Sequence, residues 1–221
     1  MAMALEHQHQ GLILLSRCMQ KPSDWITDRI SNGQLAEAIP SFFQTGTSCE
    51  PLEDTTPEHL EGSTPDPLTE LLDLLNSYRS LATGDIRKIL SSQYTRWTTV
   101  DANTTIAAAP SSPFKEAQDP LQSYRHLPGQ EIMEWYHCCG MKMPTRFVGR
   151  PDSIHMKLEF AIYLIGNISK DPDDPDHRNT YQVFLQRFFL PHLDRLLAHR
   201  CGREQFPFYY MLCALIQSYL T

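Results

Sequence analysis

The chain has 221 residues, of which 41% are hydrophobic and 20% are charged, and its formal net charge is −7. This composition is typical of a folded globular protein and excludes a disordered chain. The negative charge argues against nucleic acid as the main partner, because phosphate neutralisation needs a basic surface, but it suits a positively charged peptide.

The N-terminal segment has neither the basic start nor the long apolar run of a signal peptide or a membrane span. Its apolar run covers only Gly11 to Leu15, and no other stretch reaches about 18 uninterrupted apolar residues. The sequence therefore predicts a cytoplasmic protein without direct membrane insertion. The six cysteines include no CxxC pair, so neither a zinc site nor a disulfide framework is expected.

Apolar residues recur at helical spacing along nearly the whole chain, which predicts an all-α fold. In the first part we expect helices over residues 7–20 and 24–31, then a short helical piece interrupted by Pro40. Residues 44–66 are polar and rich in proline and glycine, which predicts a loop or linker. Asp66-Pro67 is typical of a helix start, so another helix should begin there.

The middle of the chain contains the stretch with the weakest periodicity. A helix over residues 85–97 is expected to end in a long irregular loop at about 98–126. Loops of that length in compact domains are usually functional or disordered. A capped helix should follow and end near Gly140.

The last part of the chain is the most apolar. After the buried segment at 149–169, the acidic residues 170–179 are interrupted by prolines and predict a loop. Two apolar helices, Tyr181 to His199 and Pro207 to Leu220, should complete the fold. Residues 1–221 are thus expected to form a single compact domain of about eight to ten helices.

An aspartate, a serine and a histidine lie within four residues of each other in "GRPDSIHMKLEFAIYLIGNIS" (149–169). A catalytic group would need Ser153 as nucleophile and His155 as base. Residues two apart in a helix point about 200° away from each other, and no GxSxG turn is present. We therefore expect no catalytic residues and no enzyme activity.

Two other hypotheses remain for the same residues. Asp152, His155 and Glu159 would share one helix face as metal ligands, but such a site is incomplete, so a metal-dependent hydrolase is the less favoured alternative and no metal or cofactor is expected. In the structural hypothesis, Pro151 stops any preceding helix and Asp152 or Ser153 caps the next one. Such a capped start at the surface can also bind an anion or a peptide.

The segment "RPDSIHMKLEFAIYL" resembles the Pro-Asp-His-x-x-x-(x)-Leu-Glu-Phe-x-x-Tyr-Leu segment of the TorD/DmsD/NarJ family of redox-enzyme maturation chaperones. Further stretches resemble this family in the same order: "QYTRW" (93–97), "PSSPFKEA" (110–117), "YRHLPGQEIMEWYHCCGM" (124–141), "FFLPHLDRLL" (188–197) and "FPFYYMLCALIQSYL" (206–220). The resemblance covers roughly residues 85–220. Ser153 stands where the family usually has a histidine.

The resemblance implies an all-helical, TorD-like chaperone of anaerobic respiration. Such a chaperone binds the twin-arginine leader, or another N-terminal segment, of the catalytic subunit of a molybdenum-cofactor oxidoreductase before export. A leader of this kind needs carboxylates beside an apolar groove. The candidate peptide-binding residues are Trp97, Pro113, Phe114, Tyr124 and Trp135 in the groove, with Asp152, Ser153 and His155 at its polar end. A helical adaptor for another amphipathic partner is the alternative, and a monomer or weak homodimer is expected.

Overall fold

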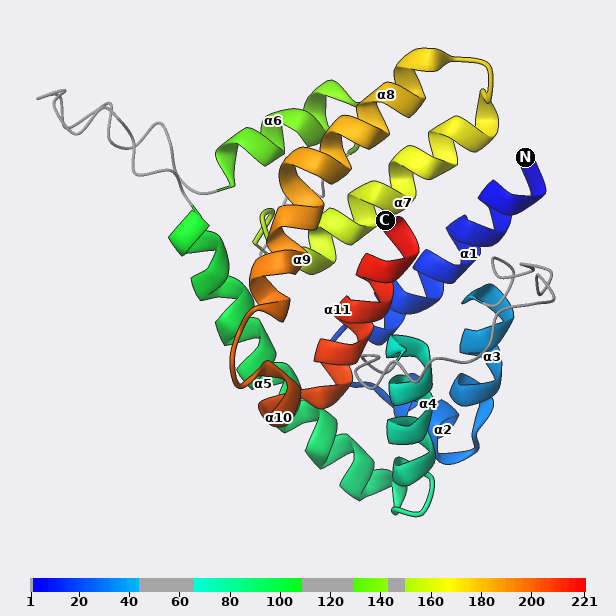
Figure 1. Cartoon of the computed structure of the whole chain (residues 1–221), viewed down its shortest axis with the longest axis vertical. Coiled ribbons are helices and arrows are strands. Elements are labelled where there is room, and N and C mark those ends of the chain that lie inside the picture. The colour runs from blue at the N-terminus through cyan, green and yellow to red at the C-terminus, as the bar shows by residue number, and fades with distance from the viewer. Residues whose placement is uncertain (1, 44–65, 109–128, 143–149) are drawn as a thin grey trace, which may run out of the picture.

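The computed structural model describes residues 2–43, 66–108, 129–142 and 150–221. These ranges contain eleven α-helices, one π-helical segment and no strand (Figure 1), which confirms the all-α fold class. The α-helices are α1 (Ala2–Cys18), α2 (Asp24–Ser31), α3 (Gln34–Phe43), α4 (Pro67–Tyr78), α5 (Thr83–Ala108), α6 (Gln130–Cys138), α7 (Ile154–Lys170), α8 (Pro175–Phe184), α9 (Leu190–Leu197), α10 (Gly202–Gln205) and α11 (Pro207–Leu220). With the continuous run from α8 to α9 counted as one helix, the described ranges hold 10, at the upper end of the expected number.

Two helices, α4 and α8, begin at an aspartate that caps the first turn and is followed by a proline. The side chain of Asp66 accepts a hydrogen bond from the backbone N–H of Thr69 (3.2 Å), and a proline opens α4 as expected. In α8, Asp174 caps the helix by accepting from the N–H of Asp176 (2.8 Å), and Pro175 follows it. The loop predicted over 170–179 is therefore wrong in its second half, because the proline there starts a helix.

The predicted loop at 98–126 is wrong over its first residues. Helix α5 continues to Ala108, and its threonine side chains stay compatible with a helix by bonding back to carbonyls: Thr99 donates to the carbonyl of Thr95 (2.9 Å). Residues 109–126 of that loop, and residues 44–65 of the linker predicted over 44–66, lie outside the described residues. Helix α3 also differs from expectation, because it runs through Pro40 without interruption.

The final predicted helix before α11 is divided by a π-helical segment, Leu185–Phe189, between α8 and α9. Pro191 gives a physical reason. It has no N–H to donate to the carbonyl of Arg187, and its ring would collide with that carbonyl in a regular α-helix. A wider turn before Pro191 relieves both problems while the helix axis continues.

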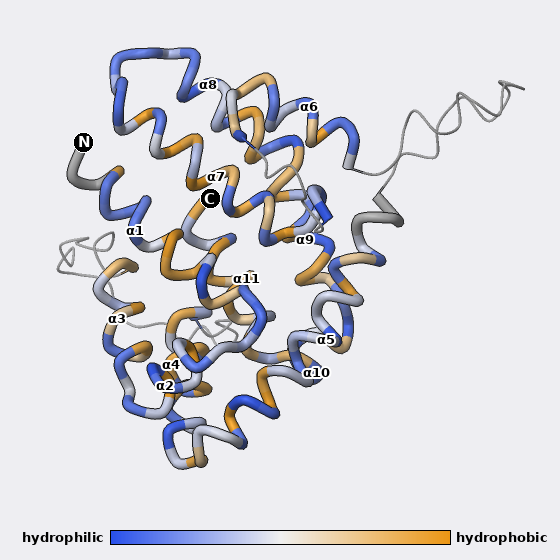
Figure 2. Tube along the Cα trace, turned by 180° about the vertical axis from the view of Figure 1, so that it is seen from behind, coloured by the Kyte–Doolittle hydropathy of each residue, from blue (hydrophilic) through white to orange (hydrophobic). Residues whose placement is uncertain are grey.

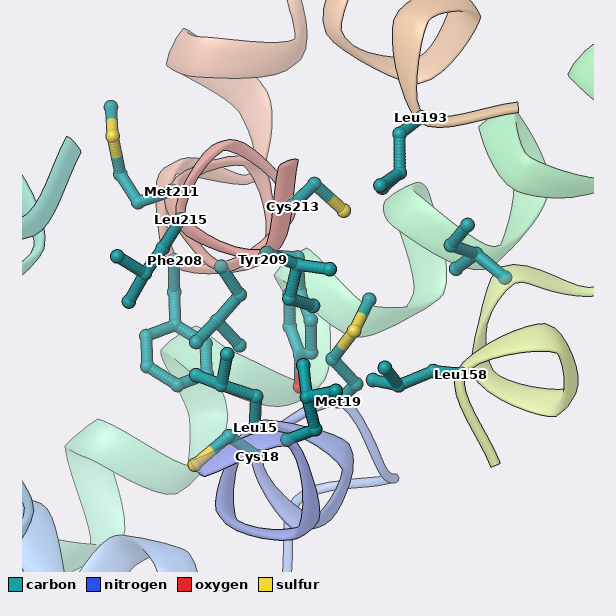
Figure 3. Packing of buried hydrophobic residues seen from close by; sticks show 14 of the residues in the cluster. Leu15, Cys18, Met19, Leu158, Leu193, Phe208, Tyr209, Met211, Cys213 and Leu215 are labelled. Carbon is teal, nitrogen blue, oxygen red and sulfur yellow. The ribbon is translucent and has the colours of Figure 1, made fainter. Parts of the chain in front are cut away.

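The core forms where α11 meets its neighbours. Helix α11 packs against α1, α4, α5 and α9, and α1 packs against α7. Figure 3 shows Leu15 and Cys18 of α1 facing Phe208 and Tyr209 of α11. Every α-helix except α10 contributes to one continuous cluster of buried apolar side chains.

Helix α7 carries a largely apolar segment into this core. Its C-terminal end leads to a hydrophilic turn before α8 (Figure 2), whereas its N-terminal end meets buried polar residues of α5 and α9. Within the described ranges, no helix combines the length and the apolarity needed to cross a membrane.

Candidate functional site

The side chain of Ser153 forms the N-cap of α7. Its hydroxyl accepts a hydrogen bond from the backbone N–H of Met156 (3.4 Å), and its backbone is extended (φ −65°, ψ 151°). A serine in this position satisfies one of the free N–H groups of the first turn. Ser153, rather than Asp152, is therefore the capping residue among the two that the sequence offered.

The three polar residues of the α7 start turn to different partners. Asp152 pairs with Arg150, whereas Nε2 of His155 lies 3.6 Å from Oε1 of Glu159. The same carboxylate accepts a hydrogen bond from the hydroxyl of Ser16 on α1. The carboxylate of Glu159 thus lies between the hydroxyl of Ser16 and the imidazole of His155. His155 is therefore not placed to take the proton of Ser16.

The proposed metal face does not assemble either. Since Asp152 is engaged by a guanidinium, it does not join His155 and Glu159 around a common point. No group of three potential His, Cys, Asp or Glu ligands occurs within the part of the chain that the structure describes.

A second residue, Asp101 of α5, supports the start of α7 from outside the helix. Its Oδ1 accepts a hydrogen bond from the backbone N–H of Ile154 (3.3 Å), and its side chain is buried. A carboxylate beside a helix N-terminus is stabilised by the helix dipole. The sequence analysis missed this residue because it lies in the segment predicted as a loop.

Asp101 begins a buried polar chain formed by Asp101, His192 and Lys157. Nε2 of His192 on α9 lies 3.0 Å from Oδ1 of Asp101, and its Nδ1 lies 3.0 Å from Nζ of Lys157 on α7. All three residues are at most 5% exposed. This buried polar chain thus links α5, α9 and α7 in the interior.

The protonation of this chain follows from its donors and acceptors. An ammonium at Lys157 can only donate, so Nδ1 of His192 accepts and the ring proton sits on Nε2, which donates to Asp101. Burial lowers the pKa of His192 below its usual 6.5, which favours this neutral ring. Burial also lowers the pKa of Lys157, to about 8, against the opposing effect of the two nearby carboxylates.

The turn formed by residues 150–153 places Asp152 next to the buried polar chain. Nη2 of Arg150 donates to Oδ2 of Asp152 (3.1 Å) and, at 3.4 Å, to the backbone carbonyl of Ala102. The aspartate side chain is 7% exposed and the arginine side chain 38%. A nearly buried carboxylate therefore faces a guanidinium that remains in contact with solvent.

Helix α6 fixes the position of the 150–153 turn. The hydroxyl of Tyr136 donates to the carbonyl of Pro151 (2.8 Å). Gly129, the N-cap of α6, has a φ of +101°, and a Cβ there would lie 3.1 Å from Cγ of Pro151 and 3.5 Å from Cβ of Asp152. Glycine permits both this backbone conformation and this close approach.

The two predicted groove residues that the structure describes, Trp97 and Trp135, pack against different neighbours. Trp97 lies in the core, 2% exposed, and stacks on Tyr209 with ring centroids 5.2 Å apart. Trp135 is partly buried and packs edge-on against Phe188 of the π-helical segment (5.3 Å). The other predicted groove residues, Pro113, Phe114 and Tyr124, lie outside the described residues.

Two surface hollows lie at the opposite end of α7. One, of about 380 Å³, is lined by residues from Pro172 to Gln182, and the other, of about 260 Å³, is lined in part by Cys138, Cys139 and His177. The 17 residues of α7 span about 26 Å, so both hollows are far from the 150–153 turn. Neither is lined by a residue of the buried polar chain.

Comparisons with protein-family models, curated proteins and solved structures return no match for this chain. The chemistry of the site therefore rests on its own residues. The arrangement around the 150–153 turn offers a fixed carboxylate, a backbone carbonyl and a solvent-exposed edge, which together suit a guanidinium group.

Proposed function

We propose that the protein is a cytosolic chaperone that binds the twin-arginine leader of a molybdenum-cofactor oxidoreductase subunit and assists the maturation of that subunit before export. The class of client comes from the sequence resemblance over roughly residues 85–220. The sequence contains no P-loop motif, GxxxxGK[ST].

The observation that carries the proposal is the pairing of Asp152 with a guanidinium. The carboxylate is nearly buried, which strengthens a charge-assisted hydrogen bond, while the guanidinium that it contacts is partly exposed. The carbonyl of Ala102 adds a second acceptor for the same group. A leader arginine would find both acceptors at this position.

The site is also held in place before any ligand arrives. The Tyr136 hydroxyl and the glycine at position 129 hold the turn that carries Asp152, and the Ser153 cap orders the residues after it. A preorganised acceptor loses less conformational entropy on binding. The net charge of −7 favours the encounter with a basic peptide over longer distances.

A peptide titration tests the proposal. Calorimetry or fluorescence anisotropy would measure the affinity for twin-arginine leader peptides of molybdoenzyme subunits, each paired with a peptide in which both arginines are lysines. We expect one leader to bind tightly and its lysine version to bind more weakly, because an ammonium cannot form the paired hydrogen bonds of a guanidinium.

Two variants distinguish binding from capping. Asp152→Asn should weaken leader binding by at least about tenfold, because the charge-assisted hydrogen bond is lost. Ser153→Ala should lower the free energy of unfolding by about 1 kcal/mol through loss of the cap, but leave the affinity unchanged. Equal capture of amphipathic peptides with and without arginines would instead support the helical adaptor.

A further inference from the structure

The pairing of Arg150 with Asp152 is weak for an arginine and a carboxylate. Only Nη2 of the guanidinium is within hydrogen-bond distance of the carboxylate, and the same nitrogen serves the carbonyl of Ala102. A guanidinium can present two parallel N–H groups to a carboxylate, and such bidentate pairs are the stronger ones. Arg150 therefore uses only part of its bonding capacity at this site.

The two partners also differ in how firmly they are held. Asp152 is fixed by the packing of its turn against Gly129, whereas the Arg150 side chain is 38% exposed. Arg150 and Asp152 are only two residues apart, so the contact between them is local in the sequence. The arginine side of the pair is open to solvent, which screens the interaction, and ion pairs screened in this way contribute about 0.2–1 kcal/mol.

We propose that Arg150 is an intramolecular competitor that occupies the guanidinium position at Asp152 until an arginine of the bound peptide displaces it. This inference rests on the proposed function and adds a regulatory residue to it. Since the competitor must leave before any cation binds, it lowers the apparent affinity of every cationic ligand by the same factor. Discrimination between arginine and lysine peptides belongs to Asp152 and its surroundings, not to Arg150.

The test compares Arg150→Gln with Arg178→Gln. Both changes remove one positive charge, but Arg178 lies at the start of α8, where it donates to the carbonyl of Pro172 (2.8 Å), at the far end of α7. Relative to the Arg178 variant, the Arg150 variant should bind the leader about twofold to fivefold more tightly. It should bind the lysine version more tightly by the same factor.

A small probe separates this inference from the proposed function. Argininamide, titrated while the backbone amide signals of Ala102 and Ile154 are followed by NMR, should shift these signals more readily in the Arg150→Gln protein than in the wild type. The double variant with Asp152→Asn should lose the effect. If Arg150→Gln binds argininamide more tightly than the wild type does, but neither protein binds a leader, the result would refute the chaperone function and support the role of Arg150 as a competitor.

The opposite pattern is equally informative. Leader binding by the wild type, without a gain in Arg150→Gln over Arg178→Gln for leader or argininamide, would overturn the competitor while leaving the chaperone proposal intact. Weaker leader binding in Arg150→Gln would also overturn it, because Arg150 would then be a direct peptide contact.

Discussion

Replacement of Lys157 by methionine tests the buried polar chain most directly. The ammonium lies 3.0 Å from Nδ1 of His192, and burial lowers its pKa from 10.5 to about 8. At about 1.4 kcal/mol per unit of pKa, this difference corresponds to about 3 kcal/mol by which folding disfavours the charged form of the lysine. Methionine has a similar length and carries no charge to bury.

The sign of the pH dependence follows from where the proton is bound. Between about pH 8 and pH 10.5, the unfolded chain still holds the proton of Lys157, whereas the folded protein has released it. The free energy of unfolding of the wild type should therefore rise with pH relative to that of Lys157→Met. The gain should reach about 2 kcal/mol between pH 7 and pH 9.5.

Urea unfolding of both proteins at the two pH values, under reducing conditions, measures this gain. Cysteines and tyrosines that titrate in the same range contribute to both proteins and cancel in the difference between them. Lys170→Met, at the exposed C-terminal end of α7, controls for the loss of a lysine charge. If the difference in free energy of unfolding between the wild type and Lys157→Met stays constant from pH 7 to pH 9.5, burial does not lower the pKa of Lys157 and the prediction is wrong.

Three further perturbations follow from the geometry. Gly129→Ala should lower the free energy of unfolding, measured by urea titration, by about 1–3 kcal/mol, because φ at this position is +101°. Gly84→Ala is the control: a Cβ there would meet nothing within 4 Å, so the change should be less than about 1 kcal/mol. Trp97→Ala should cost about 3–5 kcal/mol, and a loss below about 1 kcal/mol would contradict its place in the core. Because the pKa of His192 is lowered, the free energy of unfolding should fall as the pH drops below 6.5, where the histidine of the unfolded chain gains a proton. Urea titrations at pH 7 and pH 5 should show a smaller fall for His192→Gln than for the wild type. An equal fall in both proteins would mean that other groups cause it.

The parts of the fold that follow from local chemistry could be predicted from the sequence. Helices α4 and α11 begin at the prolines that the sequence indicated, and Ser153 caps α7 as one of two candidates. Each of these signals needs only a few neighbouring residues, since a cap or a proline acts on the first turn alone. The all-α class follows from the apolar spacing in the same way.

The continuation of α5 could not be predicted from local signals, because threonine and asparagine have low helix propensity and the apolar spacing is weak there. What stabilises the helix is tertiary: the side chain of Asp101 is buried against α7 and α9. A helical Asp101 contributes to the caps of another helix and to the polar chain, and neither contact is visible in the residues around it. The same error kept Asp101 out of the predicted site.

One signal in the sequence did point toward the polar chain. Lys157 lies in a helix that is apolar on nearly all sides, and His192 lies among the apolar residues of α9. A buried lysine or histidine needs a polar partner, so two such residues in apolar helices predict a buried contact. The sequence alone does not say that they meet each other, because they are 35 positions apart.

The charges around the α7 start explain why the site would select a cation. Asp101 and Asp152 are the acidic groups that act on the buried Lys157, and Arg150 and Arg195 are the basic ones. Displacement of Arg150 by an apolar or acidic segment would leave the carboxylate of Asp152, whose side chain is 7% exposed, without its cation. An incoming arginine would supply a guanidinium in place of the one that it displaces. On the proposed function, exchange of one guanidinium for another would therefore open this site at a smaller electrostatic cost than displacement by an apolar or acidic segment.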